Sequence, residues 1–158
     1  MKIYAVIDTN VIVSALLSRY DDAATVRVMK CILSGEIVPI LNDEILNEYS
    51  LVLGRKKFGF PDLLIETILN SICQLGVSSE RIISGVDLPD PKDLVFYEVT
   101  LSVEDSFLVT GNTKHFPKEP FVVTPAELIH IIDSIENSKS GLLSDPSKLY
   151  KSKISFDK

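Results

Sequence analysis

The sequence contains little of what builds covalently stabilised or membrane-embedded proteins. Among its 158 residues are two cysteines, Cys31 and Cys73, and no tryptophan. Neither cysteine has a second Cys or a His at metal-ligand spacing, so we predict two buried free thiols, without a disulfide framework or a zinc site. No apolar run approaches the roughly 20 residues that a membrane helix requires. Asp8 and Asn10 interrupt the apolar N-terminal stretch, so we expect no signal peptide and a cytoplasmic protein.

Basic residues are also scarce. The chain has 16 Lys and Arg against 22 Asp and Glu, which gives a formal net charge of −6. This balance argues against a protein that coats nucleic acid by bulk charge, but it allows an enzyme that uses a metal and a few local cations. With 46% hydrophobic and 24% charged residues, the chain is not intrinsically disordered.

Short apolar runs alternate with segments of helical period along most of the chain. Such alternation is typical of a parallel sheet covered on both faces. We therefore predict an α/β fold, a three-layer α/β/α sandwich with a short central parallel sheet. Pro39 indicates an edge strand or a bulge. The predicted strands are 2–7, 37–41, 107–110 and 121–123, and the predicted helices are 9–18, 23–33, 44–53, 62–75, 92–102 and 125 to about 135.

The composition changes near the C-terminus. Residues 137–158 contain five lysines, two aspartates and six serines, so their net charge is +3. They follow the last predicted helix and lack a continuous helical or strand period. We predict one domain over residues 1–136 and a polar tail over residues 137–158 that is mobile or loosely docked.

Acids and amides stand at strand ends and at helix starts. Asp8 follows the first strand directly, with Asn10 two residues later, and Asn112 follows the strand 107–110. Glu48 borders the apolar stripe of its helix, and Asp93 lies in the first turn of another. In parallel sheets, ligands bind at the carboxyl ends of the strands. Clustered carboxylates without a cationic partner require a cation, and oxygen ligands without Cys or His favour Mg²⁺ or Mn²⁺.

Each of these residues also has an ordinary structural explanation. Asp8 would serve as a helix N-cap, Glu48 as a solvated helix flank, and Asn112 as a turn residue. Asp93 would serve as a capping-box acid, although we expect Asp90 to be the cap itself. The residues alone leave both interpretations open.

Four segments together resemble the ordered motifs of the PIN-domain family. These are IDTNV (7–11), EILNEYSLVL (44–53), DPKDLVFYEV (90–99) and EDSFLVTGNTKHFP (104–117). They most resemble the toxin components of bacterial toxin–antitoxin modules. The resemblance spans roughly residues 1–135 and leaves out the tail.

The resemblance implies an Mg²⁺- or Mn²⁺-dependent ribonuclease that hydrolyses single-stranded RNA and leaves 5′-phosphate and 3′-hydroxyl ends. It also implies an antitoxin partner and a homodimer, whereas the lack of a long apolar run predicts no membrane association. The family's metal-binding acids fall on Asp8, Glu48 and Asp93, and Asn112 occupies its fourth catalytic position, which is often Asp. The positions that would support these acids or contact water and RNA are Asn10, Ser14, Glu44, Asp90, Thr110, Lys114 and His115.

Two other enzyme classes also place an acid after the first strand. A haloacid-dehalogenase-like phosphatase needs a second Asp where this chain has Asn10, and a response-regulator receiver needs a different order of acids. The remaining alternative is a degenerate PIN domain that binds RNA or a protein without cutting. Asn112 favours that alternative, whereas Asp8, Glu48 and Asp93 argue against it.

Overall fold

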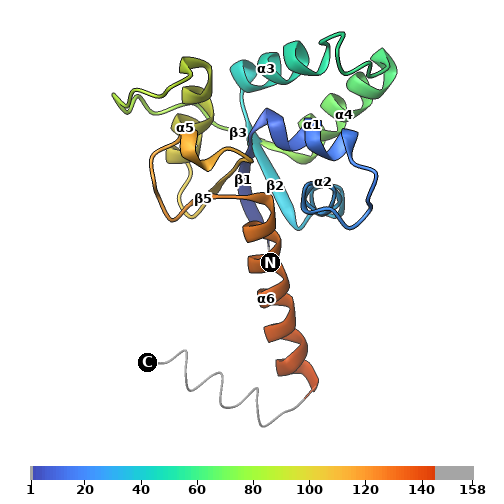
Figure 1. Cartoon of the computed structure of the whole chain (residues 1–158). Helices are drawn as coiled ribbons and strands as arrows, with labels where there is room; N and C mark the ends of the chain where they lie inside the picture. The colour runs from blue at the N-terminus through green and yellow to red at the C-terminus, as the bar shows by residue number, and fades with distance from the viewer. Residues whose placement is uncertain (1, 145–158) are drawn as a thin grey trace.

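A parallel sheet of five strands forms the centre of the molecule (Figure 1). The computed structural model describes residues 2–144, with side chains to residue 139. The spatial order of the strands is β3-β2-β1-β4-β5, and all four pairings are parallel. β1 is therefore central. The strands are β1 (Ile3–Ile7), β2 (Ile37–Leu41), β3 (Val77–Ser78), β4 (Phe107–Val109) and β5 (Val122–Val123).

Helices cover both faces of this sheet. Figure 1 shows α1, α2 and α4 to one side of the strands and α5 to the other, with α3 above and α6 extending below. This arrangement confirms the predicted three-layer α/β/α fold. The helices are α1 (Thr9–Leu17), α2 (Ala24–Ser34), α3 (Asp43–Leu53), α4 (Asp62–Leu75), α5 (Leu94–Leu101) and α6 (Pro125–Ser144), with 3₁₀ turns at Pro91–Asp93 and Thr113–His115.

Local signals in the sequence set several helix boundaries. The Asn42 side chain accepts a hydrogen bond of 2.9 Å from the Ile45 N–H and so caps α3. A reciprocal capping box opens α6, where the Thr124 hydroxyl accepts from the Glu127 N–H and the Glu127 carboxylate accepts from the Thr124 N–H, both at 3.1 Å. Gly35 ends α2 with φ of 87°, a conformation that glycine adopts without steric cost.

The core is built around β1 and α5. Ala5, Val6 and Ile7 are almost completely buried, because helices cover both faces of their strand. Every α5 residue from Val95 to Thr100 is buried, including the acidic residue Glu98. Because residues on every side of this short helix are buried, α5 is enclosed by the sheet and by other parts of the chain.

Several sequence predictions need correction. β2 has neighbours on both sides, so it is not an edge strand; Pro39 is tolerated because β3 pairs only with Ile40 and Leu41. The short β3 was not expected. The prediction of two buried thiols is wrong, because Cys31 is half-buried and Cys73 is exposed.

The C-terminal helix is longer than expected. α6 continues past Ile135 to Ser144, so the predicted helix end is wrong, and the first part of the predicted tail is helical. The rest of the predicted tail, residues 145–158, lies outside the described residues. Within the described part of the chain, no helix combines the length and the apolar character needed to cross a membrane.

Candidate functional site

The candidate site lies at the topological switch point of the sheet. From β1, the chain adds β2 and β3 on one side, and then β4 and β5 on the other. β1 is flanked by β2 on one side and by β4 on the other, so the carboxyl ends of β1 and β4 form the switch point at which open parallel sheets bind ligands. Asp8 stands at this point, and its N–H donates to the carbonyl of Val109 at 2.9 Å. The chain then turns into α1 directly after Asp8.

The Asp8 carboxylate is buried and held by neighbours from both strand ends. Asp8 is 5% exposed, and its Oδ2 accepts a hydrogen bond of 2.8 Å from the Thr110 hydroxyl. The Asn10 amide donates to the same oxygen at 3.3 Å, as predicted for a residue that orients Asp8. Asn10 in turn accepts from the Gly111 N–H at 3.1 Å. Although Asp8 occupies the N-cap position of α1, its side chain makes no cap hydrogen bond.

A tyrosine attaches α3 to the end of β1. The buried hydroxyl of Tyr49 donates to the carbonyl of Ile7 at 2.5 Å. The neighbouring residue, Glu48, is half-buried beside the apolar face of the helix. Tyr49 therefore brings the helix that carries Glu48 to the strand end that carries Asp8.

Asp93 enters the site from the 3₁₀ turn before α5. The turn is capped by Asp90, whose carboxylate accepts from the Lys92 N–H at 3.0 Å. The side chain of Asp93 makes no cap hydrogen bond and is 18% exposed. Nδ1 of His115 lies 3.7 Å from Oδ2 of Asp93. Because Asp90 does the capping, the Asp93 carboxylate is available for another partner.

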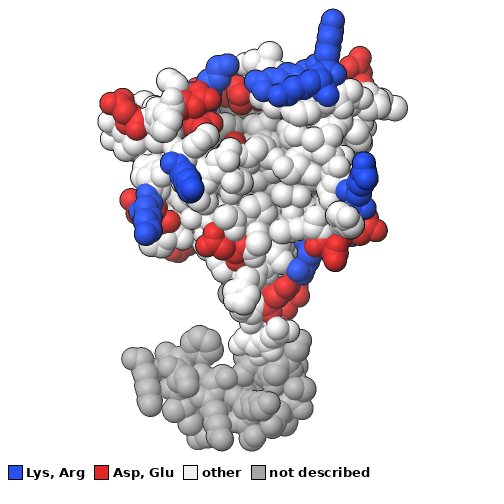
Figure 2. All heavy atoms as spheres, in the orientation of Figure 1, with Lys and Arg blue, Asp and Glu red and all other residues white. Residues whose placement is uncertain are grey.

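The electrostatics show that three of the predicted acids are neighbours. Burial raises the pKa of Asp8 to about 6, the Thr110 hydrogen bond opposes this rise, and the negative charge of Asp93 adds to it. Burial, then the charges of Asp90 and Glu48, raise the pKa of Asp93 despite the nearby His115. Across residues 2–139, neither Lys nor Arg forms an ion pair with Asp8, Glu48 or Asp93. Figure 2 shows acidic side chains gathered around the region between α5 and α3.

The donor chemistry of this group fits a hard divalent cation. The available oxygens belong to carboxylates, and burial, with a smaller contribution from neighbouring negative charges, raises the pKa values of Asp8 and Asp93. A bound cation would favour their ionised forms. The acids are not gathered into a closed ligand set, however. Among the described residues, no group of three His, Cys, Asp or Glu side chains is arranged to hold a metal ion.

The remaining predicted residues take different positions. Thr110 is fully buried and donates to Asp8, so it supports that acid; a contact of Thr110 with water or RNA stays a prediction. Asn112 is exposed; its N–H donates to the Thr110 hydroxyl and its carbonyl accepts from the His115 N–H, both at 3.0 Å. Ser14 and Lys114 are exposed on α1 and on the turn after β4. The Glu44 carboxylate lies 2.7 Å from Nη1 of Arg81.

Sequence reasoning did not single out Tyr49, Arg81 or Glu98 as part of these surroundings. Glu98 carried a readable signal, because it is the only charged residue in the apolar run LVFYEVTL. An ionised side chain in such a run needs a partner inside the fold. Arg81 carried no comparable signal, since its segment has no regular structure.

The family model of the PIN domain matches residues 4–114, which is more than half of the chain. The chain belongs to the PIN-domain family. PIN domains are generally nucleases that use divalent metal ions and act on RNA. No curated protein and no solved structure matches this PIN domain.

Proposed function

We propose that this PIN domain is an Mg²⁺- or Mn²⁺-dependent endoribonuclease that hydrolyses single-stranded RNA in the cytoplasm, as the toxin of a type II toxin–antitoxin pair. One observation carries the proposal. Asp8 is a buried carboxylate at the switch point of the sheet, it lies near Asp93, and no Lys or Arg within residues 2–139 pairs with it. A buried charge without a partner is costly, and it is retained where a ligand compensates for it.

The three acids would hold the metal, and their neighbours would keep them in place. When bound, the ion activates water and neutralises charge on the scissile phosphate. Asp8 supplies the most buried carboxylate, with one oxygen engaged by Asn10 and Thr110. Glu48 and Asp93 approach from α3 and from the turn before α5.

An exposed lysine and an exposed histidine border the same edge of the sheet. Lys114 and His115 lie in the turn after β4, and His115 reaches toward Asp93. We assign them to contacts with the RNA backbone near the scissile phosphate, because phosphate contacts position a substrate without reading its sequence.

Cleavage of single-stranded RNA tests the proposal. With Mn²⁺ or Mg²⁺, the wild-type protein should release fragments with 5′-phosphate and 3′-hydroxyl ends, and EDTA should stop the reaction. Asp8→Asn should reduce the rate by at least about a hundredfold, because it removes a charged ligand. The control is Asp62→Asn, which alters an exposed acid at the start of α4 and should cleave normally. A wild-type protein that is inactive with both metals would overturn the proposal.

A second candidate function is an inactive PIN domain that binds RNA or a protein. Asn112 favours it, because the fourth position then lacks a charge, and the side chain is exposed. The open arrangement of the acids points the same way. RNA binding that is equal with and without metal, and is never followed by cleavage, would identify this function.

The antitoxin and the homodimer belong to the same proposal. An apolar groove of about 290 Å³ lies between α1, α2 and α4, lined by Leu16, Met29 and Ile68 among others. We propose that a segment of the antitoxin fills it. Co-expression with the neighbouring reading frame should yield a complex that lacks ribonuclease activity. Light scattering of the isolated protein should give twice the chain mass of 17.5 kDa, the value for a homodimer.

A further inference from the structure

One buried charge lies outside the group of acids described above. Glu98, in the middle of α5, is 1% exposed, and its environment is otherwise apolar. Burial would raise the pKa of its carboxyl, but hydrogen bonds from Ser84 and Arg81 outweigh that effect and hold the pKa below its usual value. Glu98 is therefore ionised inside the fold.

Within the described residues, the segment that follows β3 supplies the partners of the Glu98 carboxylate. Ser84 donates to Oε2 through both its N–H, at 2.5 Å, and its hydroxyl, at 2.7 Å. Arg81 donates to Oε1 through Nε at 2.8 Å, and its Nη2 lies 2.7 Å from the same oxygen in an ion pair. The Ile82 N–H also donates to the Glu98 backbone carbonyl at 3.1 Å. This irregular segment is thus fastened to α5 along several residues.

Arg81 also reaches a second helix. Its third nitrogen, Nη1, donates to the Glu44 carboxylate on α3 at 2.7 Å. Arg81 therefore links α3 to α5 through one guanidinium group, an arrangement called the Arg81 bridge below. A guanidinium is suited to this, because its donors form a planar and rigid fork.

Both ends of the Arg81 bridge lie close to the acids of the candidate site. Glu44 precedes Glu48 by one helical turn, so the two lie on the same side of α3. Glu98 follows Asp93 by little more than one turn along α5. Without a metal, Glu48 and Asp93 repel each other, and this repulsion acts to separate the two helices. Arg81 attracts the same two helices through Glu44 and Glu98.

We propose that Arg81 is a positioning residue that holds α3 and α5 together, so that Glu48 and Asp93 stay in place to receive a divalent cation. This inference rests on the proposed function. If Arg81 had no positioning role, simple electrostatics would predict the opposite effect of its removal on metal affinity. A cation near the site repels a second cation, so removal of Arg81 would tighten metal binding if the bridge had no positioning role.

The decisive experiment measures Mn²⁺ affinity by titration calorimetry, without RNA. The first variant combines Arg81→Gln with Glu98→Gln, which leaves the net charge unchanged and avoids an unpaired buried carboxylate. We expect Mn²⁺ to bind about tenfold more weakly, the usual lower range for loss of a group that orients metal ligands. Circular dichroism at the titration temperature verifies that the variant is folded. Equal or tighter binding would overturn the inference.

A second variant does not disturb the core. Glu44→Ala removes only the α3 end of the bridge, at a side chain that is 54% exposed. Its matched control is Asp43→Ala, which removes the same charge from the adjacent exposed position. Glu44→Ala should weaken Mn²⁺ binding several-fold more than Asp43→Ala does, and equal effects would overturn the inference. A wild-type protein that binds no Mn²⁺ would overturn the proposed function, and the inference with it.

Discussion

The carboxylate of Asp8 destabilises the metal-free protein when it is ionised. Its pKa rises from 3.8 to about 6 on folding because of burial, and the charge of Asp93 adds to the rise. The folded state thus binds the proton more tightly, so the free energy of unfolding falls as pH rises from about 4 to about 6 and is level above that. Two pKa units correspond to about 3 kcal/mol as an upper value.

Asp8→Asn should therefore make the metal-free protein more stable at pH 7.5, by up to about 3 kcal/mol in urea unfolding. The advantage should shrink below pH 6 and disappear near pH 4. Asp62→Asn, at an exposed acid, should show no such pH-dependent gain. If the wild-type protein were as stable as Asp8→Asn at pH 7.5, ionisation of Asp8 would not destabilise the folded state, and the prediction would be wrong.

The hydroxyl of Thr110 opposes the rise in the pKa of Asp8. It donates to the Asp8 carboxylate at 2.8 Å, and a donor favours the ionised form. Thr110→Val removes the donor with little change in shape, so the pKa of Asp8 should rise above 6, by about one unit. Carbon-detected NMR titration measures it. Thr100→Val is the matched control, because Thr100 is equally buried but donates to the Phe96 carbonyl; the pKa of Asp8 should then be unchanged.

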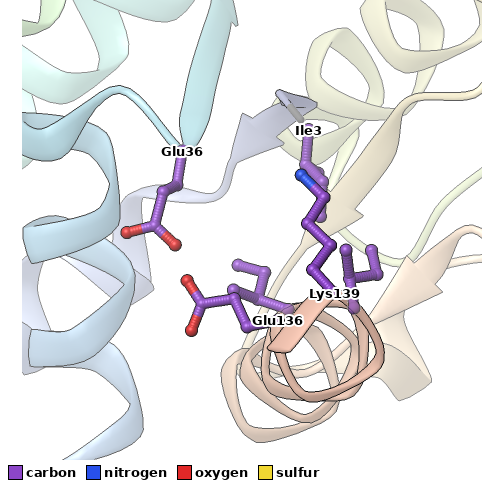
Figure 3. A pocket seen from close by; sticks show the side chains of 6 residues that line it. Ile3, Glu36, Glu136 and Lys139 are labelled. Carbon is purple, nitrogen blue, oxygen red and sulfur yellow. The ribbon is translucent and has the colours of Figure 1, made fainter. Parts of the chain in front are cut away.

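Where α6 packs near the start of β2, two glutamates face each other. Figure 3 shows the carboxylates of Glu36 and Glu136 pointing toward one another across a small pocket of about 100 Å³. The interaction with Glu36 raises the pKa of Glu136. An acid whose pKa rises on folding is harder to ionise in the folded state. Ionisation of Glu136 therefore lowers the free energy of unfolding at neutral pH and has no effect in acid, where the carboxyl group is protonated in both states.

Replacing Glu136 with Gln should therefore raise the melting temperature at pH 7 and leave it unchanged below about pH 4. Differential scanning calorimetry at both pH values makes the comparison. Glu66→Gln changes an exposed acid on α4 and should shift neither value. A gain for Glu136→Gln that is as large in acid as at neutral pH would mean that charge repulsion is not its cause.

The loop between α3 and α4 is strongly basic, although the chain as a whole is acidic. Arg55, Lys56 and Lys57 are exposed, and none forms an ion pair within residues 2–139. Figure 2 shows Lys and Arg side chains gathered over this end of α3, beside the acidic region. Lys57 lies 5.1 Å from the ring centre of Phe58. Along α3, the loop begins roughly 10 Å beyond Glu48, within reach of an RNA strand that enters the site.

Neutralising this loop should weaken RNA binding in a salt-dependent way. In an Asp8→Asn background, which prevents cleavage, the pair Arg55→Gln and Lys56→Gln should flatten the plot of log affinity against log salt by about 1.4. Arg19→Gln with Lys30→Gln removes the same charge from exposed residues around α2 and should leave the slope unchanged. Fluorescence anisotropy over a salt series measures both slopes. Equal slopes for the two double variants would exclude the loop from the RNA path.

Elements with strong local signals were predictable from sequence. α4 lies between Pro61 and Gly76 as expected, and the capping box at Thr124 and Glu127 is present as predicted. β3 was not predictable, because two exposed residues become a strand only through pairing with β2. The end of α6 was misjudged because a polar composition past Ile135 resembles a tail, although nothing in it forbids a helix.

The sequence predicted which residues form the candidate site, but it did not predict the contacts between them. Asp8, Asn10 and Asp93 stand at strand ends and helix starts, where sequence patterns are informative. The hydrogen bond from Thr110 to Asp8 joins residues 102 positions apart, and the contact of Arg81 with Glu44 joins residues 37 apart. Such contacts follow from strand order and helix packing, which no local pattern contains.

At the scale of the whole molecule, a cation that binds only the folded state must stabilise it. With free Mn²⁺ at a hundred times its dissociation constant, the gain is about 2.7 kcal/mol, or roughly 5 to 10 °C in melting temperature for a chain of this size. Calorimetric melting at low ionic strength should show this shift in the wild-type protein and lose most of it in Asp8→Asn. Equal shifts in both would place the cation elsewhere.

The strand order also has a consequence for the protein during its synthesis. A nascent chain emerges from its N-terminus, so β1 and β2 are synthesised long before β4. Until then β1 has one open edge, and Asp8 lacks the Val109 and Thr110 partners that fasten it. The ribosome must therefore complete about two thirds of the chain before the carboxylates are set in place. The order of translation delays the assembly of the site until most of the protein exists.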